Sequence, residues 1–172
     1  GPDGTVEAIA LQPDGGIVIG GTFQAVAGYS RGSMARLGAT GNLDPVFRPF
    51  LLRYDLSPGH VYKVLCLESV IFMVGRRPRS ANRSAANYLV RLNPDGTLDP
   101  GFTNGITITD GVSNIVHSLA EAPGSDALYV GGYTTYQSLA RGFLTRVTGT
   151  GALDPAFTPA SVSAAAQAAS TA

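Results

Sequence analysis

Short apolar runs recur along the chain, separated by segments rich in Gly, Pro, Asp and Asn. Runs of this length, flanked by turn residues, predict strands rather than helices. Their spacing is close to 55 residues, which is typical of a repeat architecture. We therefore predict three tandem β-sheet units of three or four strands each. The runs are VEAIAL (6–11), IVIGG (17–21) and MARL (34–37), then VYKVLCL (61–67), FMVG (72–75) and LVRL (89–92), then VHSLAEA (116–122), LYVGG (128–132) and LTRV (144–147).

Each unit closes on the same five-residue phrase. The three copies, each 55 residues after the last, are LDPVF (43–47), LDPGF (98–102) and LDPAF (153–157). The Pro holds the Asp backbone extended, and the carboxylate can accept hydrogen bonds from backbone N–H groups just downstream. We expect the Pro to end the strand and to direct a Phe anchor inward. These anchors are Phe47, Phe102 and Phe157.

The repeat divides the chain into a three-repeat β domain, residues 1–159, and an Ala/Ser-rich tail or linker, residues 160–172. The units are approximately 6–60, 61–115 and 116–159. Ile17–Ile19 and Leu128–Val130 are apolar on both faces of their strands, so these strands should be covered on both sides. Sheets stacked as β-propeller-type blades meet that demand. A threefold β-trefoil or β-prism is the alternative.

An arginine stands eight residues before the Asp of each closing phrase, with a Gly turn between the two. A hairpin centred on that turn would place each Arg opposite its Asp. Three identical copies favour a structural ion pair in every unit over three catalytic or ligand-binding pairs. The pairs are Arg36 with Asp44, Arg91 with Asp99, and Arg146 with Asp154.

The units resemble the delta-60 repeat family of bacterial β-propeller-like proteins. The residues that carry the resemblance are ALQPDGGIVIGGTF, MARL and GNLDPVF in unit one, RLNPDGTLDPGF in unit two, and LYVGGY with GALDPAF in unit three. Unit two departs from the pattern, because ESVI stands where the PDGG turn belongs and GRRP where GGTF belongs. Its first hairpin is therefore the least supported. The resemblance implies tandem copies on large, mostly secreted or surface-attached proteins, with no enzymatic activity or general set of catalytic residues.

Composition and candidate chemistry add little to suggest catalysis. Twelve basic residues balance twelve acidic ones, so no net charge attracts nucleic acid. No apolar run reaches the length of a membrane span. Cys66 is the only cysteine, and nothing in the spacing brings it to His60 or His117 as a nucleophilic pair. NPDGTLD (93–99) is interpreted as a plain turn rather than a calcium loop. We expect no metal and no cofactor.

One irregular segment, GRRPRSANRS (75–84), gathers arginines where unit two departs from the repeat. We expect an exposed loop that could bind an anionic glycan or an acidic protein surface. The bland alternative is a solvated loop that protects a sheet edge. NRS (82–84) is also a formal glycosylation sequon. The candidate ligand-binding residues are Arg76, Arg77, Arg79 and Arg83.

The sequence thus predicts a non-catalytic structural and interaction module of an extracellular or envelope-associated bacterial protein. A lectin-like carbohydrate-binding domain is the alternative, and an enzyme with a site in a central channel is less favoured. Three blades are fewer than the roughly four to eight of a propeller, and a row of blades leaves an apolar face open at each end. The expected partners are other copies of the chain or further repeats of a longer parent.

Overall fold

The computed structural model describes residues 1–49, 59–77, 86–102, 116–132, 135–136, 139–140 and 144–158. Within these residues every regular element is a β-strand, as the short apolar runs predict. No helix there is long and apolar enough to cross a membrane. The Ala/Ser-rich tail and the NRS sequon lie outside the described residues.

The described strands form three antiparallel sheets of three strands each, one from each predicted unit. Sheet 1 has the order β1-β2-β5, sheet 2 the order β6-β7-β8, and sheet 3 the order β9-β10-β13. The strands are β1 (Val6–Leu11), β2 (Ile17–Gly21), β5 (Met34–Leu37), β6 (His60–Leu67), β7 (Val70–Arg77), β8 (Ala86–Leu92), β9 (Val116–Glu121), β10 (Leu128–Gly132) and β13 (Leu144–Val147).

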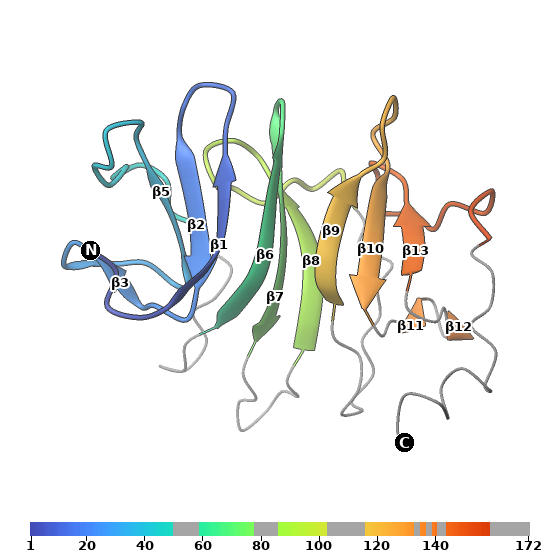
Figure 1. Ribbon diagram of the computed structural model, residues 1–172, viewed down its shortest axis with the longest axis horizontal. Helices are drawn as coiled ribbons and strands as arrows, with labels where there is room; N and C mark the ends of the chain where they lie inside the picture. The colour runs from blue at the N-terminus through green and yellow to red at the C-terminus, as the bar shows by residue number, and fades with distance from the viewer. Residues whose placement is uncertain are drawn as a thin grey trace, which may run out of the picture.

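Two short ribbons join the second and third strands of sheets 1 and 3. The first pairs β3 (Ala25–Val26) with β4 (Tyr29–Ser30), and the second pairs β11 (Thr135–Tyr136) with β12 (Leu139–Ala140). The ribbons lie 110 residues apart, which is twice the repeat. Figure 1 shows the three sheets side by side in a row, from blue through green to orange, with the turns of their first hairpins along one edge.

The first hairpin of unit two forms even though the PDGG turn is missing. β6 and β7 pair from His60 and Arg76 to Leu67 and Val70, so that Glu68 and Ser69 make a two-residue turn. Two-residue connections are common in antiparallel hairpins, and the long apolar strands on both sides supply the packing that holds this one. The replacement of the repeat's turn therefore shortens the connection without losing the hairpin.

Equivalent positions in the three sheets follow from strand register. Val6 pairs with Gly21, Val61 with Gly75, and Val116 with Gly132, and a β-bulge follows each valine. In the other direction, each recurring arginine lies opposite one residue of its central strand. These opposite pairs are Arg36 with Val18, Arg91 with Phe72, and Arg146 with Tyr129.

We call the side of each sheet that bears its recurring arginine the arginine face, and the other side the opposite face. Val18 and Met34 lie on the arginine face of sheet 1, because residues directly across a ladder or two apart along a strand share a face. They share one buried cluster with Val64, Ile71 and Met73, which lie on the opposite face of sheet 2. Sheets 1 and 2 therefore meet through unlike faces.

Sheets 2 and 3 meet in the same way. Phe72 and Leu89 on the arginine face of sheet 2 share a second buried cluster with Leu119, Leu128 and Val130 on the opposite face of sheet 3. Each large side chain buried in these clusters contributes roughly 1.5–3 kcal/mol. The sheets thus stack by one repeated contact, arginine face on opposite face, as blades of a propeller do. Sheet 2 is covered on both sides, as the two-sided apolar strands predict.

The three Phe anchors are not equally buried. Phe47 is fully buried between sheets 1 and 2. Phe102 and Phe157 are half-buried, so the expectation of three equivalent buried anchors is only partly met. Phe102 packs edge-on against Phe72, with ring centroids 5.6 Å apart, and Phe157 packs in the same manner against Tyr129 at 5.3 Å. In the described chain no sheet follows sheet 3 to cover Phe157.

Candidate interaction site

The three predicted Arg–Asp pairs are in contact, each across its own Gly turn. Backbone N–H groups of the three Asp residues donate to the carbonyls of the paired Arg residues at 2.9–3.0 Å, so the hairpin sets the side chains side by side. The side-chain distances are 3.1 Å from Arg36 Nη1 to Asp44 Oδ2, 2.8 Å from Arg91 Nε to Asp99 Oδ2, and 2.7 Å from Arg146 Nε to Asp154 Oδ2.

The second carboxylate oxygen of each Asp shapes the turn after it. Asp44 Oδ1 accepts the backbone N–H of Val46 at 2.8 Å. The equivalent bonds run from Gly101 N to Asp99 Oδ1 at 2.8 Å and from Ala156 N to Asp154 Oδ1 at 2.9 Å. These are the Asx-type turns that the LDPxF phrase predicts. One carboxylate therefore fixes both the hairpin and the start of the crossing to the next unit.

Hydrogen bonding lowers the pKa of two of these carboxyl groups. For Asp154 the backbone N–H of Ala156 is the largest cause, followed by the guanidinium of Arg146. For Asp44, burial acts to raise the pKa, but the N–H groups of Val46 and Phe47 together with Arg36 outweigh it. Both groups are therefore charged in the folded protein at neutral pH, as the ion-pair interpretation requires.

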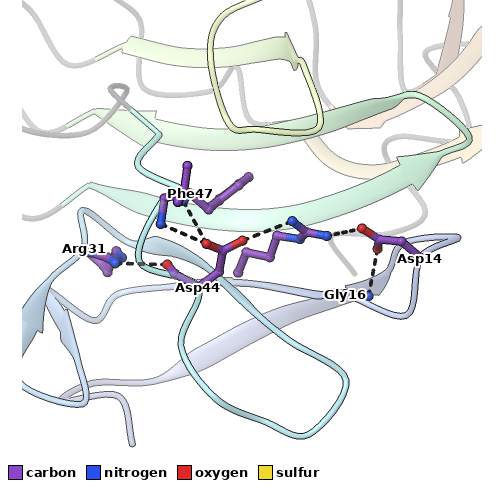
Figure 2. Close-up of polar contacts among 7 residues, drawn as sticks. Asp14, Gly16, Arg31, Asp44 and Phe47 are labelled. Carbon is purple, nitrogen blue, oxygen red and sulfur yellow. Dashed lines mark hydrogen bonds and ion pairs between the residues drawn. The ribbon is translucent and has the colours of Figure 1, made fainter.

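Unit one extends its pair into a larger network, drawn in Figure 2. Arg36 also bonds Asp14, whose other oxygen accepts the N–H of Gly16 at 2.9 Å. Arg31 donates to the backbone carbonyl of Asp44 at 3.1 Å and is almost fully buried. The sequence analysis did not single out Arg31, because it has no counterpart in the repeat and its role depends on the fold around it.

The remaining candidate arginines are placed differently from the prediction. Arg76 and Arg77 are not in a loop, because their backbones belong to β7 and pair with Asn87 and Ala86 of β8. The physical reason is that β7 and β8 continue their ladder past the point where the repeat pattern breaks. Arg79 and Arg83 lie outside the described residues. Binding of an anion by this segment stays a prediction.

A row of polar and aromatic side chains runs across the first strands of the three sheets. Glu7, Tyr62 and His117 are the residues at the three β-bulges. His60 Nε2 lies 2.7 Å from Glu7 Oε2. The ring centroids of His60 and Tyr62 are 4.2 Å apart, and those of Tyr62 and His117 are 6.4 Å apart. In the part of the chain that the structure describes, no group of three or more His, Cys, Asp or Glu residues could hold a metal ion.

Cys66 packs against the core between sheets 1 and 2 rather than lying in this row. Burial raises the pKa of its thiol to about 11, so the sulfur is a neutral thiol at physiological pH. A neutral thiol is a poor nucleophile. The environment of Cys66 is therefore that of a structural core residue.

The opposite face of sheet 1 is apolar and partly open. Ile9 and Leu11 are 66% and 69% exposed, and they pair with Ile19 and Ile17 on the same face. Phe23 covers one part of this face in a third buried cluster, together with Val26. The residues equivalent to Ile9 in the other sheets are buried under a neighbouring sheet: Val64 and Leu119.

The arginine face of sheet 3 is open at the other end of the row. Leu144 is 42% exposed, whereas the equivalent Leu89 of sheet 2 is fully buried. Tyr129 and Arg146 beside it are half-buried. The stack therefore ends in two unlike surfaces, the opposite face of sheet 1 and the arginine face of sheet 3. Inside the stack, surfaces of these two kinds pack on each other.

Comparison with known families identifies one match. A family model described as a domain of unknown function (DUF5122) beta-propeller matches residues 12–47 and 74–102. Both matched spans end on the Phe of an LDPxF phrase, Phe47 and Phe102. Comparisons with curated proteins and with solved structures gave no match. The chain is all-β and of β-propeller type, and in these two spans it is similar to that beta-propeller domain of unknown function.

Proposed function

We propose that the chain is a non-catalytic structural and interaction module that acts by stacking β-sheet units on one another. The observation that carries the proposal is the exposure of Ile9 and Leu11 on the opposite face of sheet 1. The equivalent positions in sheets 2 and 3 are covered by the arginine face of the preceding sheet. The open face is thus shaped for one more unit of the same kind.

Close backbone approach supports stacking as the purpose of these faces. A Cβ atom added to Gly20 would collide with Val61 of sheet 2, so glycine at this position lets the two sheets meet. The contact between units is also polar, because Ser33 Oγ donates to the carbonyl of Gly59 at 2.6 Å in a buried hydrogen bond. Each unit thus gains stability mainly from its neighbours, which is the behaviour of repeat proteins.

An extracellular or envelope-associated location is part of the proposal. It is supported by the resemblance of the units to delta-60 repeats, which belong to mostly secreted or surface-attached proteins. Fractionation of the source cells, with an antibody against residues of the exposed 38–42 turn, would test it. Recovery of the protein only from the cytosolic fraction would contradict this part of the proposal.

Carbohydrate binding is a second candidate function. It is favoured by the row of Glu7, His60, Tyr62 and His117, which offers hydrogen-bonding groups beside an aromatic ring, and by the arginines from 76 to 83. Screening on a glycan array that includes sulfated chains would test both. Loss of binding in Tyr62→Ala would assign the ligand to the row. Loss in the triple variant Arg76→Ser, Arg77→Ser, Arg79→Ser would assign it to the arginines.

A lengthened chain tests the stacking proposal directly. A second copy of residues 6–60, inserted after residue 60, would add one sheet and one contact of arginine face on opposite face. We expect a single cooperative unfolding transition with a higher midpoint than that of the natural chain, because nearest-neighbour contacts add up in repeat proteins. The matched control carries Val18→Ser and Met34→Ser in the inserted copy only, and it should lose the gain. A four-unit chain no more stable than the natural one would contradict the proposal.

A further inference from the structure

We propose that two copies of the chain dock head to tail, with the arginine face of sheet 3 of one copy on the opposite face of sheet 1 of the other. In this arrangement Arg146 donates to the backbone carbonyl of Ala39 in the second copy. The inference rests on the proposed function and deepens it by naming the partner and the register. A ring of two copies holds six sheets, within the roughly four to eight blades of known propellers.

The apolar parts of the two open surfaces match those that already meet inside the chain. Leu144 and Tyr129 occupy the positions of Leu89 and Phe72, which pack on the opposite face of sheet 3. Ile9 occupies the position of Leu119, which receives them. The second copy therefore presents large apolar side chains where the internal contact has them. Each chain carries both halves of the interface, so two copies suffice.

The polar register comes from Arg91. Its Nε is held by Asp99 Oδ2 at 2.8 Å, its guanidinium lies 5.5 Å from the centroid of the Phe102 ring, and its Nη1 donates across the unit boundary to the carbonyl of Gly149. Gly149 lies in the turn of the next unit and is buried there. An arginine fixed by its own unit thus bonds the backbone of the following unit.

Arg146 is fixed in the same way at the end of the stack. Its Nε is held by Asp154 at 2.7 Å, and its guanidinium lies 5.4 Å from the centroid of the Phe157 ring. No unit follows sheet 3 in the described residues, so Arg146 there has no turn of a following unit to bond. The side chain is therefore held in the orientation that Arg91 uses for its contact.

The turn of unit one offers the matching acceptor. In that turn Gly38 N donates to Asn42 O and Gly41 N to Gly38 O, both at 2.8 Å. In unit three Thr148 N donates to Ala152 O and Gly151 N to Thr148 O, also at 2.8 Å. The two turns have the same bonds, and Ala39 is the equivalent of Gly149. Ala39 is exposed, whereas Gly149 is buried.

Arg36 shows why this contact is specific to some units. Its guanidinium bonds Asp14 in the first turn of its own unit. The corresponding position in the first turn of unit three is Gly124, which offers no carboxylate. Arg146 therefore corresponds to Arg91 rather than to Arg36. The interface joins unlike faces, and closure of two such contacts gives a twofold ring.

Sedimentation velocity and equilibrium on the full chain test the proposal. We expect a reversible species at twice the 17.7 kDa of one chain. Leu11→Glu should block one half of the interface and Leu144→Glu the other half, so each variant alone should sediment as a monomer. Mixed in equal amounts they should form a heterodimer, because one intact interface remains. Val46→Glu is the matched control, since Val46 is exposed but lies in the LDPVF turn, and it should keep the mass of the natural chain.

The role of Arg146 is tested by the dissociation constant of the dimer. Arg146→Met should weaken it by about tenfold or more, as loss of a charge-assisted hydrogen bond does. Asp154→Asn keeps the donor and should have a smaller effect.

A natural chain that stays at 17.7 kDa at every concentration would overturn the proposal, and so would association of either single variant with itself. Failure of the two variants to pair, with both folded by circular dichroism, would also overturn it. None of these results affects the stability gain of the lengthened chain, so the proposed function is tested separately.

Discussion

The ring of Phe47 covers Gly96, so that the anchor of unit one lies on the turn of unit two. Gly96 is buried and has a φ of +90°, and a Cβ atom added to it would lie 3.0 Å from the Phe47 ring. The equivalent Gly41 in unit one has a φ of +83° and nothing within 4 Å of such an atom. The two glycines share a backbone conformation and differ only in the neighbouring unit.

This pair of glycines allows a matched test of the contact between units. Both Gly96→Ala and Gly41→Ala place a side chain at positive φ, which costs about 1–2 kcal/mol. Gly96→Ala also forces the buried Phe47 ring to move, so we expect a further loss of about 1–3 kcal/mol from overpacking. Chemical denaturation of the two variants measures the difference. Equal losses would show that Phe47 does not restrain the turn.

The Asp44 corner should respond to substitution in graded steps. Asp44→Ala removes the acceptor for the N–H of Val46 and the partner of Arg36 together, and we expect a loss of about 1–3 kcal/mol in the free energy of unfolding. Asp44→Asn keeps an oxygen for the N–H groups and should lose less. Asp14→Ala, which removes only the exposed partner of Arg36, should have the smallest effect. If Asp44→Asn is as damaging as Asp44→Ala, the charge rather than the turn controls stability.

Acid should destabilise the protein through the same carboxyl groups. The pKa values of Asp44 and Asp154 are lowered in the folded state from 3.8. A group whose folded pKa lies below its unfolded pKa contributes stability above the unfolded value and loses it as the pH falls through the folded value. We therefore expect the free energy of unfolding to fall below about pH 4. Asp44→Asn should flatten that fall, and an unchanged pH profile in this variant would contradict the assignment.

Alkylation of Cys66 should report the separation of sheets 1 and 2. The thiol packs in the cluster between these sheets and its pKa is raised to about 11 by burial, so we expect iodoacetamide to react slowly with the native protein and quickly in urea. Phe47→Ala removes a fully buried ring from that cluster and should raise the native rate. Native labelling as fast as labelling in urea would show that the cluster does not protect the thiol.

Much of the repeat could be predicted because its signals are local. The eight-residue spacing of Arg36 and Asp44 reflects one hairpin, and the carboxylate bond to the N–H of Val46 involves neighbours in sequence. Such contacts depend on turn chemistry that every unit carries in full. The strand pattern is local in the same sense, since each short apolar run pairs with the next one along the chain.

Other features depend on contacts between distant residues, which no spacing reveals. The Glu7–His60 pair links strands of different units, and the burial of Arg31 depends on its place beside the LDPVF turn. Arg76 and Arg77 were expected in a loop because the repeat pattern fails there, but ladder pairing with β8 continues through them. The exposure of Leu11, against the partial burial of its counterpart Cys66, follows from position in the stack rather than from residue type.

The β-bulge after the first valine of each unit has a consequence for how such chains diversify. The bulged residue stands outside the regular ladder, so its side chain is freed from the alternation that fixes the core. This chain places Glu7, Tyr62 and His117 there without altering the register of the three hairpins. The position thus accepts acidic, aromatic or basic side chains at will, and a lineage of such units can exchange the chemistry of its rim one unit at a time while its scaffold stays the same.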